Sequence, residues 1–181
     1  MKAIPCALEG VFLLEPVCHS DSRGFFMESY HAAALAAVAG DFAFVQDNHS
    51  LSEKAGVLRG LHFQLPPKAQ TKLVRVTAGA VYDVVVDLRR SSPTFGRWAG
   101  FLLTASNKRQ LLVPKGFAHG FCTLVPRTEF LYKVDEYYSP EHDRGIAWDD
   151  PDLGIDWPVA NPLMSDKDRS LPRLRETGFT F

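Results

Sequence analysis

The sequence predicts an all-β sandwich or barrel, and two observations support this prediction. Short segments rich in Val, Leu, Phe and Tyr recur along the chain, with turn residues between them at a spacing of roughly ten residues. Regular turns of this kind are typical of β-sandwiches and barrels. The chain has 181 residues, of which 46% are hydrophobic and 23% charged, a size and balance that suit one substantial core. We therefore expect a single domain over residues 1–181.

Three segments fit buried strands best, namely Lys72 to Val76, Ala80 to Leu88 and Ala99 to Thr104. The pairs Pro66-Pro67 and Ser92-Pro93 mark loops, because proline cannot continue a ladder of hydrogen bonds. The sequence thus predicts strands on both sides of these loops.

Two further segments depart from the strand pattern. His31 to Ala39 is nearly all alanine, and Gly40 follows it at the position of a helix C-cap, which predicts one short helix. From Ser139 onward the composition shifts to Pro, Asp and Gly, with Trp148 and Trp157 interspersed. We expect an irregular tail that packs over the sandwich, with both tryptophans in the core.

Charge and cysteine content exclude several classes of protein. Twenty basic and 21 acidic residues give a net charge of −1, so no overall field draws the chain to nucleic acid or to a membrane. Cys6, Cys18 and Cys122 form no C-x-x-C pair, which argues against a disulfide framework and a structural zinc site. Glu9 and Glu15 interrupt the first apolar stretch, so we expect neither a signal peptide nor a membrane span. A cytoplasmic protein fits these features.

The densest polar cluster on apolar ground is RGLHFQ, residues 59–64. On an extended strand Gly60, His62 and Gln64 share one face, which makes that face a pocket candidate. An isolated H-x-Q segment also fits an exposed strand with one ordinary histidine. The surrounding motifs must therefore distinguish a pocket from an exposed surface.

A second cluster, VPKGFAHGF at residues 113–121, surrounds His119 with a proline, two glycines and aromatic residues. Pro-x-Gly alone is a common turn. A Gly-x-His strand followed about fifty residues later by P-x-G-x-x-H resembles the cupin jelly rolls, in which both histidines face the barrel interior.

The residues around this pair argue against a metal. Most metal-binding cupins carry H-x-H and a later Glu, because a divalent ion needs three or more protein ligands. Here Gln64 stands in place of the second histidine, and Lys72 lies in the stretch expected to supply the Glu. We expect a pocket without metal or other cofactor, in which Lys72 stabilises negative charge that develops on a substrate.

Six segments occur in the order typical of one enzyme family. They are DSRGFFME (21–28), VQDNHS (45–50), LRGLHFQ (58–64), SPTFG (92–96), PKGFAHGF (114–121) and YYSP (137–140). From end to end the chain resembles the dTDP-4-dehydrorhamnose 3,5-epimerases, the third enzyme of the dTDP-L-rhamnose pathway. The resemblance implies a cupin-type double-stranded β-helix (jelly roll) with short helices and an irregular C-terminal tail. It also implies a homodimer, in which Arg23 and Glu28 reach the partner's substrate.

The resemblance further implies roles for individual residues. It makes His62 the general base and Tyr132 the acid on the opposite face of the sugar. It places Lys72 at the C4 oxygen of the sugar and Asp168 behind the imidazole of His62. Tyr138 would stack on thymine, and Asp143 stands where family members often have Glu. The remaining ligand-binding positions are Arg23, Glu28, Gln46, Asp47, Asn48, Arg59, His119 and Lys167.

The chemistry of a 4-keto sugar agrees with these residue types. Its protons on C3 and C5 are both α to the carbonyl, so each can be removed if the enolate oxygen is stabilised. An imidazole titrates near neutral pH and suits this task once a carboxylate fixes its tautomer. A phenol can return a proton to the opposite face. Inversion at both carbons would convert dTDP-4-dehydro-6-deoxy-D-glucose to dTDP-4-dehydro-L-rhamnose.

Other readings remain open at this point. A related enzyme would invert C3 or C5 only, or isomerise the substrate to a 3-keto sugar. A metal-dependent cupin dioxygenase conflicts with Gln64 and Lys72, and a non-catalytic sugar-binding cupin conflicts with the base and acid pair. Away from the motifs, Arg23 and Arg59 would be ordinary surface charges, and Asp168 would simply lie in a helix opened by Ser165.

Overall fold

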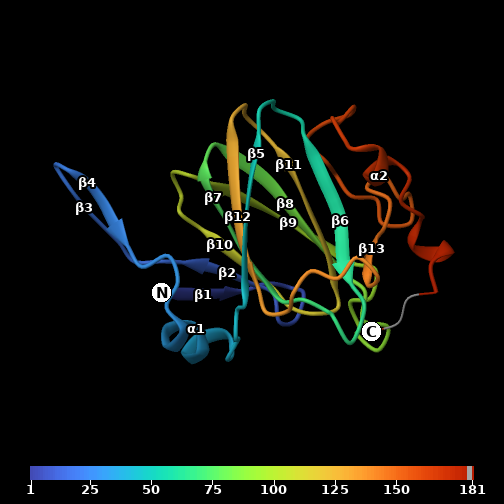
Figure 1. The fold of residues 1–181 in the computed structure, drawn as a ribbon, viewed down its shortest axis with the longest axis horizontal. Helices are drawn as coiled ribbons and strands as arrows, with labels where there is room; N and C mark the ends of the chain where they lie inside the picture. Colours follow the sequence, from blue (N-terminus) through green and yellow to red (C-terminus); the bar gives the residue numbers. More distant parts are fainter. Residues whose placement is uncertain (179–180) are drawn as a thin grey trace.

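The computed structural model describes residues 1–178 and residue 181, and it consists mainly of two facing antiparallel sheets (Figure 1). The six-stranded sheet has the order β1 (Lys2–Pro5), β2 (Phe12–Glu15), β10 (Gln110–Val113), β7 (Lys72–Ala78), β12 (Thr128–Val134) and β5 (Gln46–Ser52). The five-stranded sheet has the order β13 (Asp143–Gly145), β6 (Leu58–Gln64), β11 (Phe117–Thr123), β8 (Ala80–Asp87) and β9 (Trp98–Thr104). The all-β prediction is confirmed.

The elements predicted from local pattern are present. Strands β7, β8 and β9 cover the three predicted strand segments, with bounds that differ by one or two residues. Helix α1 (Ala32–Ala39) begins after His31, whose Nδ1 accepts a hydrogen bond from the Ala34 amide at 3.2 Å. It ends at Gly40, where φ is +107°, a conformation that favours glycine. No helix among the described residues has both the length and the hydrophobicity needed to cross a bilayer.

The C-terminal tail is more ordered than we expected. It contributes strand β13, which pairs with β6, together with helix α2 (Asp166–Arg169) and a 3₁₀ turn at Leu174–Glu176. Trp157 packs on the apolar cluster of the five-stranded sheet, and its Nε1 donates to the Trp148 carbonyl at 2.8 Å. The tail thus covers the sandwich, but the prediction that both tryptophans lie in the core was wrong: both are half-buried, and only Trp157 packs against a core cluster.

Apolar side chains fill one part of the space between the sheets. Val74 and Val76 of β7 meet Val85 of β8, with the stacked rings of Phe121 and Phe130 beside them. Because this cluster occupies only part of the interior, the strands can hold polar groups beyond it. Burial of such side chains contributes roughly 1.5–3 kcal/mol each relative to exposure.

The hairpin of β3 (Cys18–Asp21) and β4 (Gly24–Met27) projects away from both sheets (Figure 1). Its residues are exposed apart from Met27, and the Phe26 side chain is among the most exposed apolar groups of the chain. A hairpin with so little support from its own chain is well placed to contact another molecule.

Candidate active site

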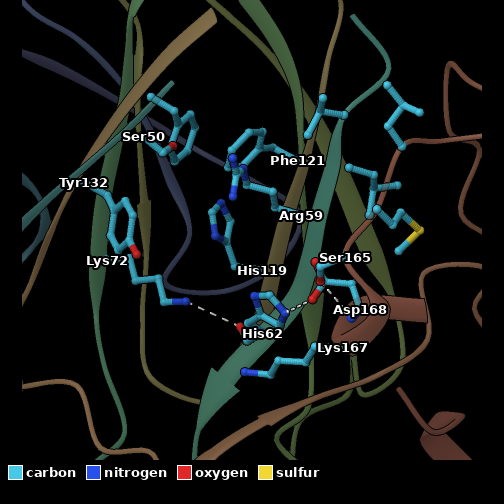
Figure 2. A pocket seen from close by; sticks show the side chains of 15 residues that line it. Ser50, Arg59, His62, Lys72, His119, Phe121, Tyr132, Ser165, Lys167 and Asp168 are labelled. Atoms are coloured by element: carbon cyan, nitrogen blue, oxygen red, sulfur yellow. Dashed lines mark hydrogen bonds and ion pairs between the residues drawn. The ribbon is translucent and has the colours of Figure 1, made fainter. Parts of the chain in front are cut away.

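A cavity of about 550 Å³ opens between the two sheets, next to the apolar core. Figure 2 shows the charged and aromatic side chains that converge on it. Strands of both sheets and the C-terminal tail supply its polar lining, which is Ser50, Arg59, His62, Lys72, His119, Tyr132, Ser165, Lys167 and Asp168.

A β-bulge in β6 determines which of its side chains face this cavity. His119 and Phe121 of β11 lie two residues apart, but they pair with His62 and Arg59, which are three residues apart. The extra residue shifts the alternation of β6, so that Arg59 joins His62 in the cavity lining. Simple alternation had placed Gly60, His62 and Gln64 together, whereas Gln64 is absent from the lining.

Gly60 permits the close approach of β6 and β11 at this bulge. Its φ is +128°, and a Cβ added there would lie 2.6 Å from the Gly120 Cα and 2.9 Å from the His119 carbonyl oxygen. Backbone atoms cannot yield as a flexible side chain can, so only glycine fits. The result is that His62 and His119 lie directly opposite each other across the strand pair.

The tail holds the imidazole of His62. Asp168 Oδ1 lies 2.6 Å from His62 Nε2, and Ser165 caps α2 by accepting from the Asp168 amide at 3.1 Å. Burial opposes ionisation of this carboxyl, but the hydrogen bonds from His62 and Ser165 outweigh it and hold the pKa of Asp168 below its ordinary value. The carboxylate therefore directs the Nε2 proton of His62 toward itself and leaves the lone pair on Nδ1.

A second histidine–aspartate pair lies deeper. His119 Nε2 is 2.9 and 3.0 Å from the two carboxylate oxygens of Asp83, and both side chains are buried. Burial raises the pKa of Asp83, although His119 and Lys72 oppose the shift. Asp83 was not among the site residues predicted from the sequence. The signal was an aspartate in the middle of the valine-rich strand β8, where a charged side chain must find a partner if it is buried.

Lys72 extends from β7 toward His62, on the side opposite Asp168 (Figure 2). Its Nζ donates to the His62 carbonyl at 3.4 Å. Burial lowers the pKa of Lys72 to about 8, while the negative charges of Asp143 and Asp83 limit the shift. The ammonium group is therefore charged at neutral pH and lies beside the proposed base.

Tyr132 stands on the other wall of the cavity. It belongs to β12 of the six-stranded sheet, whereas His62 belongs to the facing five-stranded sheet. Burial raises the pKa of Tyr132 and the nearby Arg59 opposes this, so the phenol stays protonated at neutral pH. A base and a proton donor thus face the cavity from opposite sides.

Three predicted ligand-binding residues, Tyr138, Asp143 and Lys167, contact one another at one end of the site. Asp143 Oδ2 accepts a hydrogen bond from the Tyr138 hydroxyl at 3.2 Å and forms an ion pair with the Lys167 ammonium. This ion pair also raises the pKa of Lys167 above its ordinary value. The shorter carboxylate at position 143 therefore still links the tail to the aromatic residue.

The structure does not bring every predicted residue to the cavity. Gln46 and Asn48 share one side of β5 and bond to each other at 2.9 Å, whereas Asp47 pairs with Lys133 and lines a separate hollow that also includes Asn48. Arg23 lies in the projecting hairpin, is 88% exposed and bonds to its neighbour Asp21. Glu28 follows the same hairpin, beyond the cavity lining.

The described part of the chain holds no cluster of metal ligands. Among the described residues, His, Cys, Asp and Glu side chains form no group of three or more that could hold an ion. Two histidine–aspartate pairs instead lie in or beside the cavity, and Lys72 also lines it.

Comparison with known proteins finds relatives that match nearly the whole chain. The family model for dTDP-4-dehydrorhamnose 3,5-epimerase matches residues 5–176. Epimerases of that name from Pseudomonas aeruginosa and Shigella flexneri are 56% and 55% identical, each over 93% of both chains.

Solved structures agree in fold. A dTDP-4-dehydrorhamnose 3,5-epimerase from Bacillus anthracis, with TDP and PPi bound, is 59% identical with a TM-score of 0.94, over 96% of this chain and 99% of that one. An epimerase from Legionella pneumophila in complex with dTDP-4-keto-L-rhamnose is 45% identical with a TM-score of 0.93, over 97% and 93%. These matches confirm the predicted jelly roll, and the chain belongs to the dTDP-4-dehydrorhamnose 3,5-epimerase family.

Proposed function

We propose that this chain inverts C3 and C5 of dTDP-4-dehydro-6-deoxy-D-glucose and gives dTDP-4-dehydro-L-rhamnose, without a metal or other cofactor. The observation that carries the proposal is the geometry of the cavity. A carboxylate-oriented imidazole and a half-buried phenol face each other across it, with an ammonium group beside the imidazole.

Each inversion removes one proton from the substrate and delivers a different proton to the opposite face. His62 Nδ1 takes the proton from the carbon α to the ketone, and the electron pair of that C–H bond moves to the C4 oxygen. The ammonium of Lys72 donates to the enolate oxygen and offsets its charge. The Tyr132 hydroxyl then delivers a proton to the other face of the carbon, and the C4 carbonyl is restored. Solvent returns a proton to Tyr132 and removes one from His62, so the reaction consumes none.

The nucleotide would lie along the outer part of the cavity. Arg59 offers forked donors to a diphosphate, and Lys167 adds a point charge. Tyr138 offers an aromatic face to thymine. We propose that the enzyme is a cytoplasmic homodimer, in which the projecting hairpin carries Arg23 and Glu28 to the partner's cavity.

A single-carbon epimerase is the second candidate. The solved 3′-monoepimerase from Streptomyces bikiniensis, in complex with dTDP-quinovose, is 36% identical to this chain with a TM-score of 0.89. Its identity is well below that of the Bacillus anthracis enzyme, so inversion at both carbons is the better-supported reading.

The test is incubation of dTDP-4-dehydro-6-deoxy-D-glucose with the enzyme in deuterated water, followed by NMR at C3 and C5. We expect deuterium at both carbons and the L-rhamno configuration in the product. His62→Ala should slow both exchanges by roughly 10²-fold or more, since only weak solvent assistance remains. Deuterium at one carbon alone would establish the monoepimerase instead, and exchange at the wild-type rate in folded His62→Ala would remove the base assignment.

A further inference from the structure

The segment from Glu136 to Ser139 carries Tyr138 but belongs to no strand. It begins the connection between β12 and β13, which passes the C-terminal end of β6 in Figure 1. Backbone groups outside a ladder need other partners, and here three glutamine side chains supply them.

Each glutamine binds different peptide groups of this segment. Gln70 Nε2 donates to the Glu136 carbonyl at 2.8 Å, and Gln46 Oε1 accepts from the Tyr138 amide at 3.1 Å. Gln64 makes two of the contacts, because its Nε2 donates to the Tyr137 carbonyl at 3.2 Å and its Oε1 accepts from the Ser139 amide at 2.8 Å.

Gln64 is the most fully engaged of the three. Its side chain is 3% exposed, and its second amide hydrogen goes to the Lys68 carbonyl at 2.6 Å. Both donors and the acceptor of the amide are thereby used. Gln64 is also the register partner of Asp143 on β13, the residue that accepts from the Tyr138 hydroxyl. The backbone of the segment, and through Asp143 the Tyr138 ring, are thus both fixed relative to β6.

We propose that Gln64 is a positioning residue that sets affinity for the nucleotide by holding the backbone of the Glu136–Ser139 segment in place. The inference rests on the proposed function, since it takes Tyr138 as the thymine contact. Tyr138 is 54% exposed and receives little packing that would hold it otherwise. A loop that must be ordered at binding weakens affinity, whereas a loop ordered in advance does not. Because the nucleotide does not react, its contacts stabilise the ground state and the transition state equally. Their loss therefore raises KM and leaves kcat unchanged.

Gln64→Met tests this in the full-length enzyme. Methionine keeps the length of the side chain and removes all three hydrogen bonds. We expect the Kd for dTDP, measured by calorimetry, and the KM for the sugar nucleotide each to rise about tenfold, with kcat within about threefold of wild type. The matched control is Gln110→Met. Gln110 is also buried, but it donates to the Ser29 carbonyl outside the cavity, and its variant should keep both constants within about twofold.

Gln64→Glu gives a second, pH-dependent readout. Its ionised carboxylate would face the Lys68 and Tyr137 carbonyl oxygens, whereas the protonated acid can still donate to one of them and accept from Ser139. The affinity for dTDP should therefore recover as pH falls from 8 to 5.5, relative to wild type at each pH. The wild-type series accounts for the other charged groups at this point, which are Lys68, Glu136, Asp143, His62 and Lys72.

The results of these experiments distinguish a failure of the Gln64 proposal from a failure of the proposed function. Wild-type enzyme that neither binds dTDP nor converts the sugar nucleotide would refute the proposed function itself. With an active wild type, unchanged dTDP affinity in folded Gln64→Met would overturn the inference, as would a fall in kcat with no change in KM. If Gln64→Met does not fold by circular dichroism, Gln64→Glu decides, and an affinity for dTDP with the pH dependence of wild type would overturn the inference.

Discussion

The lowered pKa of Lys72 predicts an alkaline limit to activity. Its pKa is about 8 because burial disfavours the charged form. If Lys72 must be protonated to stabilise the enolate, kcat/KM should fall as pH rises through this value, since kcat/KM reports the free enzyme. Half of the activity is lost at pH 8, and about a tenth remains at pH 9.

Other groups of the cavity do not produce this limit. Burial raises the pKa of Tyr132 above its ordinary 10.0, and the ion pair with Asp143 raises the pKa of Lys167 above its ordinary 10.5. Both stay protonated up to about pH 9.5. The assay is the initial rate of product formation, coupled to an excess of a reductase specific for dTDP-4-dehydro-L-rhamnose, between pH 6.5 and 9.5.

Lys72→Met is the control for this limit. The variant should turn over roughly 10²–10³-fold more slowly, and its residual rate should show no fall near pH 8. A wild-type profile that stays flat to pH 9.5, or the same fall in Lys72→Met, would refute the assignment of the charge to Lys72.

The same shift in pKa makes a prediction about stability. Lys72 has a folded pKa of about 8 against an ordinary value of 10.5, so the unfolded chain binds more protons between these values and wild-type stability rises with pH across this window. The folded state is penalised below pH 8 by at most about 3 kcal/mol. Urea unfolding should therefore find Lys72→Met more stable than wild type at pH 7, with the difference closing by about pH 10.

Three further predictions test the rest of the mechanism. Tyr132→Phe keeps the ring and removes the donor, so deuterium exchange at the α carbons should survive with retained configuration while product falls far more; equal losses would show that Tyr132 is not the opposite-face acid. Asp168→Asn keeps the shape but not the charge behind His62, so kcat should fall by roughly 10² or more with dTDP affinity unchanged by calorimetry, and a near-normal kcat would contradict the orienting role. Treatment with a chelator should leave full turnover, whereas a loss restored only by a divalent ion would overturn the cofactor-free mechanism.

Local pattern predicted the fold class, three of the strands and one helix. Strands β7, β8 and β9 and helix α1 follow from residue type and turn spacing, since each pattern favours one structure over several consecutive residues. Strand β13 could not be predicted in this way. Its sequence, Asp143-Arg144-Gly145, has no strand character, and it forms because the edge of β6 offers hydrogen-bonding partners far away in sequence.

The candidate site shows the same division between local and distant causes. The motifs pointed to His62 and His119, the stretch where metal-binding cupins carry a Glu pointed to Lys72, and the family resemblance added Tyr132. The structure brings all four to one cavity. Asp83 escaped notice because one aspartate in a core strand has no motif of its own, and only its distance to His119 reveals its role.

The seven residues of strand β6 line the cavity, pack in the core and anchor a loop, and the β-bulge decides which side chains face the cavity. The bulge, which depends on the register with β11, turns Arg59 and His62 into the cavity, while Leu61 and Phe63 pack in the cluster under the tail. Gln64 then lies at the end of the strand, where a metal-binding cupin would carry its second histidine. Here that position is covered by the Glu136–Ser139 segment and bonded to its backbone. An amide at this position, outside the cavity lining, provides an anchor for the loop at the edge of the site. The strand that supplies the proposed base can therefore also preorganise the proposed nucleotide contact.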